Sequence, residues 1–312
     1  MRDRTPPTPE QYLQWAEQFS NWGRWGADDE MGTLNFVTDD VRRRAASLVQ
    51  DGRCVGLGRP IDTRPSPSNP FPAHHFVAVE GSGGMLDYLG MFIHGFRQTH
   101  IDALCHLPTA SGRFWNDHVA GPHGMPADHS GTIDYWRSGV TTRGVLYDIP
   151  RLRGAEYVEP GKPVMAWELL DAAAAQGVEP MSGDAVVIRC GRGRFEALHP
   201  HGMPGFGLPA GVHGGVAEFL YKHEAALVVW DWLDAPAADQ GLPRIGAGGP
   251  DVQLHVHDIV LPYMGLPLVD NADLEGLSEY CSAAGRWTFQ LIVAPLVIVR
   301  GTGSPVNPLA LF

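Results

Sequence analysis

The chain has 312 residues, of which 44% are hydrophobic, and it carries a formal net charge of −12. This charge argues against a general nucleic-acid role, because proteins bind phosphate backbones through basic faces, so we expect a small-molecule substrate as the partner. The sequence has no stretch of about 18 apolar residues and no apolar signal region near its start, which predicts no membrane contact and a soluble, cytoplasmic protein.

The apolar periodicity predicts alternating helices and strands. Helical spacing, with a Thr or Asp near each start, predicts two N-terminal helices at residues 8–19 and 38–49. Runs rich in β-branched residues predict strands at 144–149, 184–190, 225–232 and 287–299, the last long enough to bend or to make two strands. Further helices are expected at 166–176, 214–222 and 273–284. The alternation predicts a mixed α/β fold in which helices cover the sheet, without deciding between a parallel sheet and a swivelling β/β/α architecture.

A short polar motif lies between the first helices and the first of these strands. Its residues His100, Asp102 and His106 are spaced so that two imidazoles and a carboxylate can converge on one divalent ion. Alternate residues of an extended chain share a face, so His100 and Asp102 project together, with His94 on the same parity. This nitrogen and oxygen set suits Zn²⁺ or Mn²⁺ better than Ca²⁺ or Mg²⁺. The alternative is a set of polar residues near a turn, each satisfied by backbone.

The motif resembles the signature of the cyclase-like metal-dependent hydrolases, a family that includes bacterial kynurenine formamidase and isatin hydrolase. The family pattern is His-x-Gly-Thr-His-x-Asp-x-Pro-x-His, and four positions match it: Thr99, His100, Asp102 and His106. Three positions, Phe96, Gln98 and Leu104, stand where the pattern has His, Gly and Pro. The His missing at residue 96 is a metal ligand in the family, and His94 is the candidate that replaces it.

The resemblance extends over most of the chain, through residues 25–35, 143–148, 183–189 and 301–308, which are similar to a longer-chain branch of the family. It implies one cyclase-like hydrolase domain over residues 1–312, with residues 1–50 as a helical segment packed on it. The implied architecture is the swivelling β/β/α fold, with central mixed sheets flanked by helices. We also expect a homodimer or a homotetramer.

The remaining metal ligands are implied by the same resemblance. In the family, a His followed about a dozen residues later by a Glu completes the metal site, often with a second ion shared through the motif Asp. His257 and Asp270 match these places, with His255 as a competing register, and Asp270 is one methylene shorter than the usual Glu. The alternative is that His255 and His257 lie on an exposed strand edge. The cofactor expected is therefore one or two divalent ions, Zn or Mn.

Two further residues are candidate substrate contacts. His213 lies in a Gly-flexed turn before a predicted helix, where it can donate to a substrate oxygen or serve as a cap. Trp25 can stack on a substrate or pack in the core. Cys105, between Asp102 and His106, has the parity of a buried packing residue rather than of a nucleophile.

These residues predict metal-dependent hydrolysis of an arylformamide, a cyclic amide or a lactone. The metal would activate water, and His106 would be the catalytic residue that moves the proton. The resemblance implies arylformamidase-like activity, in tryptophan breakdown to kynurenine, as the nearest named reaction. Two alternatives stay open. One is a polyketide-type cyclase or lyase whose metal stabilises an enolate, and the other is a metal-free small-molecule binder, which the departures at Phe96 and Gln98 permit.

Overall fold

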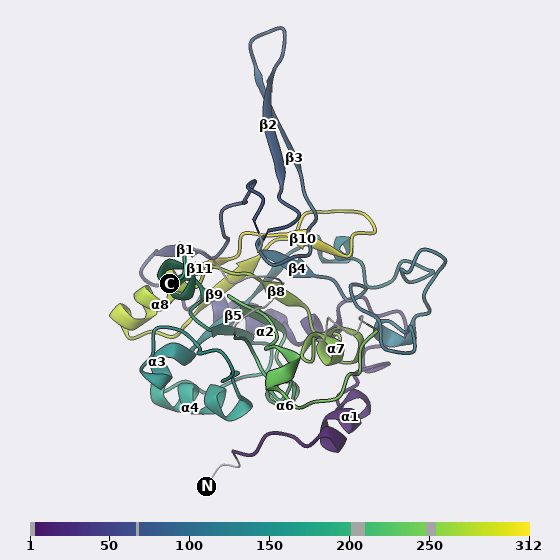
Figure 1. Cartoon of the computed structure of the whole chain (residues 1–312), viewed down its shortest axis with the longest axis vertical. Helices are drawn as coiled ribbons and strands as arrows, with labels where there is room; N and C mark the ends of the chain where they lie inside the picture. The colour runs from purple at the N-terminus through teal and green to yellow at the C-terminus, as the bar shows by residue number, and fades with distance from the viewer. Residues whose placement is uncertain (1–3, 67–68, 201–209, 248–253) are drawn as a thin grey trace.

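The computed structural model describes residues 4–66, 69–200, 210–247 and 254–312 (Figure 1). Within these residues the strands are β1 (Cys54–Gly56), β2 (His74–Val79), β3 (Met85–Gly90), β4 (His100–Asp102), β5 (Val140–Asp148), β6 (Ala185–Arg189), β7 (Leu227–Trp230), β8 (Leu268–Asp270), β9 (Thr288–Val293), β10 (Gly303–Pro305) and β11 (Leu309–Leu311). Nine of them form one mixed sheet in the order β1-β11-β9-β5-β6-β7-β8-β4-β10, and β2 pairs with β3 alone.

The helices of the described residues are α1 (Pro9–Gln18), α2 (Asp39–Ala46), α3 (Ile149–Arg153), α4 (Ala166–Gln176), α5 (Arg192–Leu198), α6 (Val216–Lys222), α7 (His257–Ile259) and α8 (Glu275–Ala284). Shorter turns are η1 (Gly32–Phe36), η2 (Trp115–Asp117), η3 (Ile133–Trp136), η4 (Ala237–Asp239) and the π-helical η5 (Val260–Met264). None of these helices is long and apolar enough to cross a bilayer. The predicted fold class, a mixed α/β fold with helices flanking a central mixed sheet, is confirmed.

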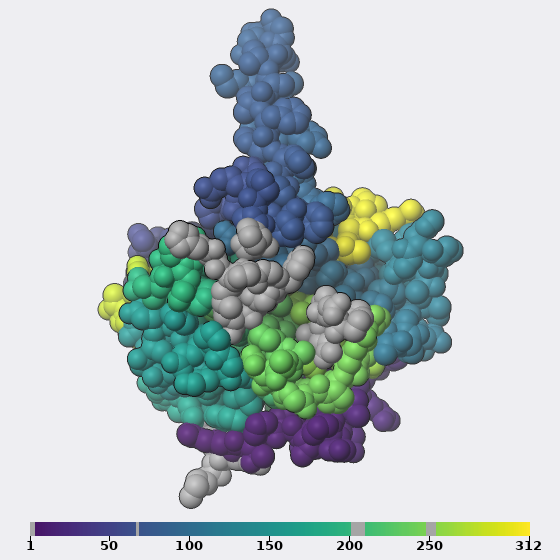
Figure 2. Space-filling model, in the orientation of Figure 1, coloured from purple at the N-terminus to yellow at the C-terminus, as the bar shows by residue number. Residues whose placement is uncertain are grey.

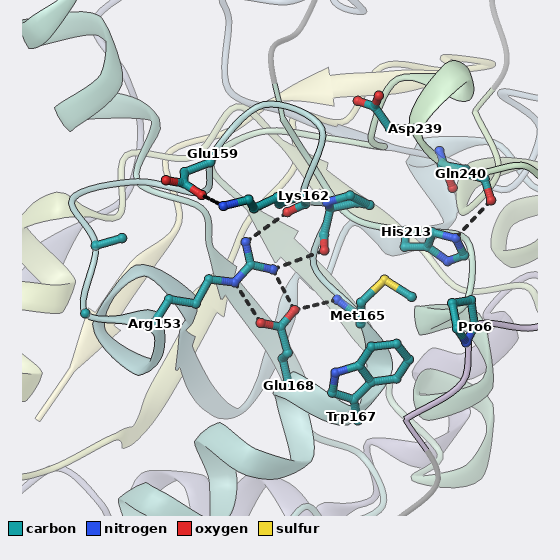
Figure 3. Close-up of a pocket in the computed structure, with 13 residues that line it drawn as sticks. Pro6, Arg153, Glu159, Lys162, Met165, Trp167, Glu168, His213, Asp239 and Gln240 are labelled. Carbon is teal, nitrogen blue, oxygen red and sulfur yellow. Dashed lines mark hydrogen bonds and ion pairs between the residues drawn. The ribbon is translucent and has the colours of Figure 1, made fainter.

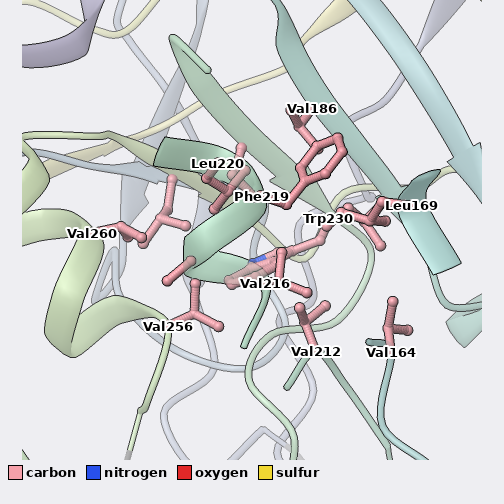
Figure 4. Packing of buried hydrophobic residues seen from close by; sticks show 14 of the residues in the cluster. Val164, Leu169, Val186, Val212, Val216, Phe219, Leu220, Trp230, Val256 and Val260 are labelled. Atoms are coloured by element: carbon pink, nitrogen blue, oxygen red, sulfur yellow. The ribbon is translucent and has the colours of Figure 1, made fainter. Parts of the chain in front are cut away.

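The centre of the sheet is buried on both faces. Strands β5, β6, β7 and β8 run parallel to one another, and their nearly continuous apolar runs are typical of strands covered on both sides. Alternate residues of these strands point to opposite faces of the sheet. Val186 and Trp230 pack with α4 and α6 in one cluster (Figure 4), while Val187 and Val229 belong to a second cluster that includes residues of α8.

The elements expected from periodicity are present. Most have shorter bounds, but α4 has the expected bounds, β5 begins four residues before the expected start at 144, and one element differs in kind. The run 287–299 forms a single strand, β9, that ends at Val293, and a loop then leads to β10. Val293 lies opposite Val140, the first residue of the partner strand β5, so the ladder has no partner beyond that point. Pro295, which lacks a backbone N–H, is also unable to continue a central strand.

A hairpin stands apart from the rest of the fold. Strands β2 and β3 rise from the body as a long two-stranded ribbon (Figures 1 and 2). Sequence periodicity did not predict it. The hairpin leads through residues 91–99 into β4, which carries His100 and Asp102 of the candidate metal motif.

Candidate metal centre

Strand pairing brings the motif together with a residue far along the chain. β4 lies between β8 and β10 and is antiparallel to both. His100 and Asp102 share one face of β4, and Asp270 of β8 lies directly opposite His100, so the three side chains project to the same side of the sheet. Although Asp270 is shorter than the Glu of the family pattern, it reaches the motif because its strand pairs directly with β4.

Two overlapping groups of donor atoms surround Asp102. His100, Asp102 and Asp270 form one group, and His94, Asp102 and His106 form the other, with the donor atoms of each group within 4.8 Å of one another. The Asp102 side chain is buried, and its Oδ2 has no hydrogen-bond partner among the described residues. An unpaired carboxylate oxygen is costly to bury, so this atom is a natural ligand for a cation.

Two imidazoles are oriented with one nitrogen toward this carboxylate. His100 donates from Nδ1 to the carbonyl of Gln98 at 2.8 Å, which leaves its Nε2 3.5 Å from Oδ1 of Asp102 and 3.8 Å from Oδ2 of Asp270. His257 donates from Nδ1 to Oδ2 of Asp234, and its Nε2 lies 3.5 Å from Oδ2 of Asp102. Histidine ligands usually donate a hydrogen bond from one ring nitrogen and bind the ion through the other.

The separations between donor atoms match those around a small ion. Nε2 of His257 lies 3.3 Å from Oδ2 of Asp270, and the other separations just given are 3.5–3.8 Å. Ligands about 2.0–2.1 Å from a tetrahedral ion are roughly 3.3–3.4 Å from one another. The indole N–H of Trp230 donates to Oδ1 of Asp270 and so directs Oδ2 toward the other donors. The described residues therefore fit a divalent transition-metal ion without large movement.

His94 reaches the cluster through a bend rather than along an extended strand. Residues 91–99 form no strand, so strand parity alone does not place His94 beside His100 and Asp102. The amide of Asn271 donates to the carbonyls of Gly95 and Gln98, which holds this bend. Nδ1 of His94 lies 2.8 Å from Oδ1 of Asp102 and Nε2 lies 2.9 Å from the Thr302 hydroxyl. Both ring nitrogens thus have polar partners, and metal binding by His94 stays a prediction.

His106 lies on the partly open side of the cluster. Its ring stacks on that of His94, with centroids 3.7 Å apart and planes 9° from parallel, and its Nε2 is 3.9 Å from Oδ2 of Asp102. The side chains of His94 and His106 are 26% and 21% exposed, whereas those of His100, Asp102 and His257 are at most 2% exposed. A small molecule can therefore approach the cluster from the side of His94 and His106.

The charges of the cluster are strongly coupled. Burial lowers the pKa of His106 to about 4. Burial alone would raise the pKa of the Asp102 carboxyl, but the surrounding imidazoles, His106 foremost, hold it well below its usual value. Burial alone would lower the pKa of His257, but the carboxylates of Asp234 and Asp270 raise it well above its usual value. The concentration of carboxylates in a buried site favours a bound cation.

The competing register at His255 is not the one that faces the cluster. His255 is buried, its Nε2 donates to the carbonyl of Leu242, and its ring contacts that of Tyr12. The expectation of an exposed strand edge is also wrong, because both His255 and His257 are buried. Cys105 packs in the core as expected, where burial raises the pKa of its thiol to about 12.

The two candidate substrate contacts are used in other ways. His213 accepts from the backbone N–H of Gly215 and donates to the carbonyl of Gln240, and it lines a cavity of about 710 Å³ beside Arg153 and Glu168 (Figure 3). No residue of the two donor groups lines this cavity within the described chain. Trp25 packs against Phe36 and Trp115 in the second apolar cluster. The structure therefore does not bring His213 or Trp25 to the donor groups.

Sequence reasoning missed the residues that position the ligands. Asp234 and Trp230 contact His257 and Asp270 respectively, and Asn271 holds the bend before β4. One sequence signal was available for Asp234. It lies just beyond the carboxyl end of the parallel strand β7, and such loops often carry function.

Comparisons with known proteins show a matching family model and similar folds. A family model described as "Putative cyclase" matches residues 57–239. A crystal structure described as a novel cyclase is similar over 95% of this chain and 99% of its own, with 27% identity and a TM-score of 0.77. Isatin hydrolase A from Labrenzia aggregata, bound to benzyl benzoate, is similar in fold over 85% of this chain and 94% of its own, with 18% identity and a TM-score of 0.56. An isatin hydrolase bound to the product analogue thioisatinate gives 18% identity, 86% and 94% coverage, and a TM-score of 0.55. No curated protein matches the chain.

Proposed function

Since this chain belongs to the family described as "Putative cyclase", we propose that it is a metal-dependent hydrolase that opens an amide or a lactone with water. The observation that carries this proposal is the buried Oδ2 of Asp102, which faces imidazole and carboxylate donors and has no partner of its own among the described residues. Burying an unpaired carboxylate oxygen costs free energy unless a cation neutralises its charge.

Four residues would hold the first ion: His100, Asp102, His257 and Asp270. The donor set of two nitrogens and two oxygens favours Zn²⁺ or Mn²⁺. A divalent ion held there would polarise a substrate carbonyl and make water a better nucleophile near neutral pH. The second donor group, with His94 and His106, shares Asp102, but an ion there would occupy the His106 nitrogen, so we propose one ion and a free His106 imidazole.

The proposed catalytic residue is His106. It is uncharged near neutral pH, because burial lowers its pKa, and it lies on the open side of the cluster. Its ring can therefore accept a proton from the attacking water and return one to the leaving group. His94, stacked on it and bonded to Asp102, holds the ring in place.

The proposed substrates are compounds in which a carbonyl carbon is bonded to nitrogen or to a ring oxygen. Isatin hydrolases share the fold of this chain, which supports a cyclic amide such as isatin as one substrate to assay. An arylformamide is the second, because arylformamidase-like hydrolysis, the step from tryptophan toward kynurenine, breaks the same kind of bond. A lactone is the third.

Metal analysis of the purified chain and two of its variants tests the proposal. We expect at least one divalent transition-metal ion per chain, and loss of most of it in His100→Ala and in Asp102→Ala. The matched controls are His75→Ala and Asp87→Ala, a hydrogen-bonded His and Asp pair on the exposed hairpin, which should keep the metal. Full metal content in both site variants would refute the assignment of the site.

Turnover in H₂¹⁸O separates the reaction classes. Hydrolysis places one solvent oxygen in the product, and we expect this label with isatin, an arylformamide or a lactone as substrate. Turnover without the label would refute hydrolysis in favour of a cyclase or lyase. A chain that holds no metal as purified, and binds none when Zn²⁺ or Mn²⁺ is added, would refute the metal-dependent enzyme in favour of a small-molecule binder.

A further inference from the structure

Three arginines meet around one carboxylate of helix α5. Nη1 of Arg97 and Nε of Arg192 lie 2.8 Å and 2.9 Å from Oε1 of Glu196. Nη1 of Arg59 lies 3.2 Å from the other oxygen, Oε2. One carboxylate balances only one of these three positive charges. Arg59, Arg97 and Arg192 are called the arginine cluster below.

A second carboxylate, Asp62, does not restore the balance. Its Oδ2 lies 3.6 Å from Nη2 of Arg97, and its Oδ1 also pairs with Arg64, a side chain that is 88% exposed. Even with the charge of Asp62 assigned wholly to the cluster, three guanidiniums share two carboxylates in the ion pairs of the described residues. One positive charge is left in excess, although the formal net charge of the chain is −12.

Burial makes this excess charge costly. The side chain of Arg192 is 3% exposed and that of Arg59 is 11% exposed. Nε of Arg59 is buried and has no hydrogen-bond partner among the described residues. Burial, together with the nearby charge of Arg59, lowers the pKa of Arg192 to about 10, so Arg192 is still a cation near neutral pH. A buried cation without a full partner destabilises the fold, and a bound anion would remove this penalty.

Hydrogen bonds connect the arginine cluster to the metal donors. Nη1 of Arg192 donates to the side chain of Asn271, the residue after Asp270. Asn271 donates to the carbonyl of Gln98, which also accepts from Nδ1 of His100. Three hydrogen bonds thus separate the guanidinium from a donor ring. Since each spans about 3 Å, the guanidinium lies on the order of 10 Å from the donor atoms, a distance that a small aromatic molecule can span.

The arginine cluster also shares the bend of residues 91–99 with the open side of the metal centre. Arg97 belongs to this bend, as His94 does, and Arg192 donates to the carbonyl of Phe96 within it. The backbone N–H of Arg59 donates to the hydroxyl of Thr99 at 2.8 Å. The side chains of His94 and Arg97 are 26% and 24% exposed, so solvent reaches both.

We propose that the arginine cluster binds a carboxylate group of the substrate while the metal centre holds the carbonyl that is cleaved. This inference rests on the proposed function and narrows its substrates to amides or lactones that carry a carboxylate. Guanidiniums bind planar carboxylates through charge-assisted hydrogen bonds, and the cluster already holds both oxygens of Glu196 in this way. A single carboxylate also matches the one positive charge in excess. Positive charge beside the site would further speed the arrival of an anionic substrate.

Binding of matched small molecules tests the proposal without turnover. The probes are 2-, 3- and 4-acetylbenzoate, whose ketone carbonyl bears no leaving group and whose carboxylate lies at three distances from it. The corresponding acetylbenzamides have the same shape without the charge. In calorimetric titrations of the purified protein, we expect at least one benzoate to bind about tenfold or more tightly than its benzamide, because only the benzoate forms charge-assisted hydrogen bonds.

Two variants of the cluster should remove this preference. Arg59→Gln and Arg97→Gln should each weaken binding of that benzoate about tenfold and leave binding of the benzamide unchanged. Arg97→Lys should recover part of the loss, because it keeps the charge but not the planar pair of donors. Metal content should match the wild type, since the ion pairs of Arg59 and Arg97 in the described chain involve no donor residue.

Arg194→Gln is the matched control. Arg194 lies on the same helix, but it pairs with Glu156 and not with Glu196. The variant removes the same charge and should change neither affinity.

Three results would overturn the proposal. One is equal affinity for benzoates and benzamides, or no measurable binding of any benzoate. Another is a preference that survives in both glutamine variants, which would assign the carboxylate to the metal ion. The third is displacement of the benzoate by inorganic phosphate at an equal concentration, which would assign the cluster to a free anion. Each can occur in a chain that holds its metal and incorporates solvent ¹⁸O, so the carboxylate site can fail while metal-dependent hydrolysis stands.

Discussion

Replacing Asp234 with asparagine tests how far the metal centre depends on a residue that contacts no ion itself. Oδ2 of Asp234 accepts from Nδ1 of His257, and Oδ1 accepts from the backbone N–H of Val256. Both carboxylate oxygens are therefore in use, and the side chain is buried. Asparagine has the same shape but only one acceptor oxygen, so one of the two N–H groups must lose its partner.

The expected loss of metal affinity depends on which of the two N–H groups keeps the asparagine oxygen as its acceptor. If its oxygen stays on Val256, its NH₂ group faces His257 and favours the tautomer with the proton on Nε2, the nitrogen that faces Asp102 and Asp270. An ion can bind that nitrogen only after the proton moves away. If the oxygen turns to His257, the buried N–H of Val256 is left unpaired. Either outcome should cost about ten- to a hundredfold in metal affinity, which is about 1.4–2.7 kcal/mol.

Competition with a coloured chelator measures this affinity for Zn²⁺ and Mn²⁺ in each variant. Asp231→Asn is the matched control. Asp231 is also a buried carboxylate, and it accepts hydrogen bonds from the backbone N–H groups of residues 190–192. None of its hydrogen bonds in the described chain involves a residue of the two donor groups. The control should lose thermal stability while it keeps its metal affinity. Wild-type affinity in Asp234→Asn, or an equal loss in both variants, would refute the reasoning.

Two further predictions concern the open side of the centre. His106→Ala should keep the metal and lose on the order of 10²–10⁴ in kcat, measured with metal-loaded protein, and loss of metal together with activity would make His106 a ligand instead. His94→Ala should weaken metal binding about ten- to a hundredfold, because His94 orients Asp102 or binds the ion directly. Phe96→Ala should lower Tm through lost packing at unchanged metal affinity, and a reversal of these two results would show that residue 96 carries the role.

Sequence spacing predicted strands β5, β6, β7 and β9 of the large sheet, because their apolar runs stand out as β-rich segments. It also indicated His257 and Asp270, although only through the family pattern. The register that places Asp270 opposite His100 is a property of the paired strands β8 and β4, each of three residues. Such short strands leave no periodic signal, so the contact could not be derived from either segment alone.

The hairpin was missed for a related reason. Periodic alternation reveals a strand when one face is apolar and the other polar, but residues 76–79 are apolar without interruption. A run of that kind is typical of a strand that is buried in a sheet on both faces. In the structure the strand is instead part of an exposed hairpin with apolar residues on both faces.

The bend before β4 shows how the chain compensates for its departure from the family pattern. Arg192 is buried, and its guanidinium donates to the carbonyl of Phe96 and to the side chain of Asn271, while Asn271 donates to the carbonyls on either side of Phe96. These bonds fix the turn that carries His94 back to Asp102. The buried donors His100, Asp102, His257 and Asp270 lie together, while the departures at Phe96 and Gln98 lie in the bend that positions His94. We therefore expect these two departures to affect the position of His94 more than the positions of the buried donors.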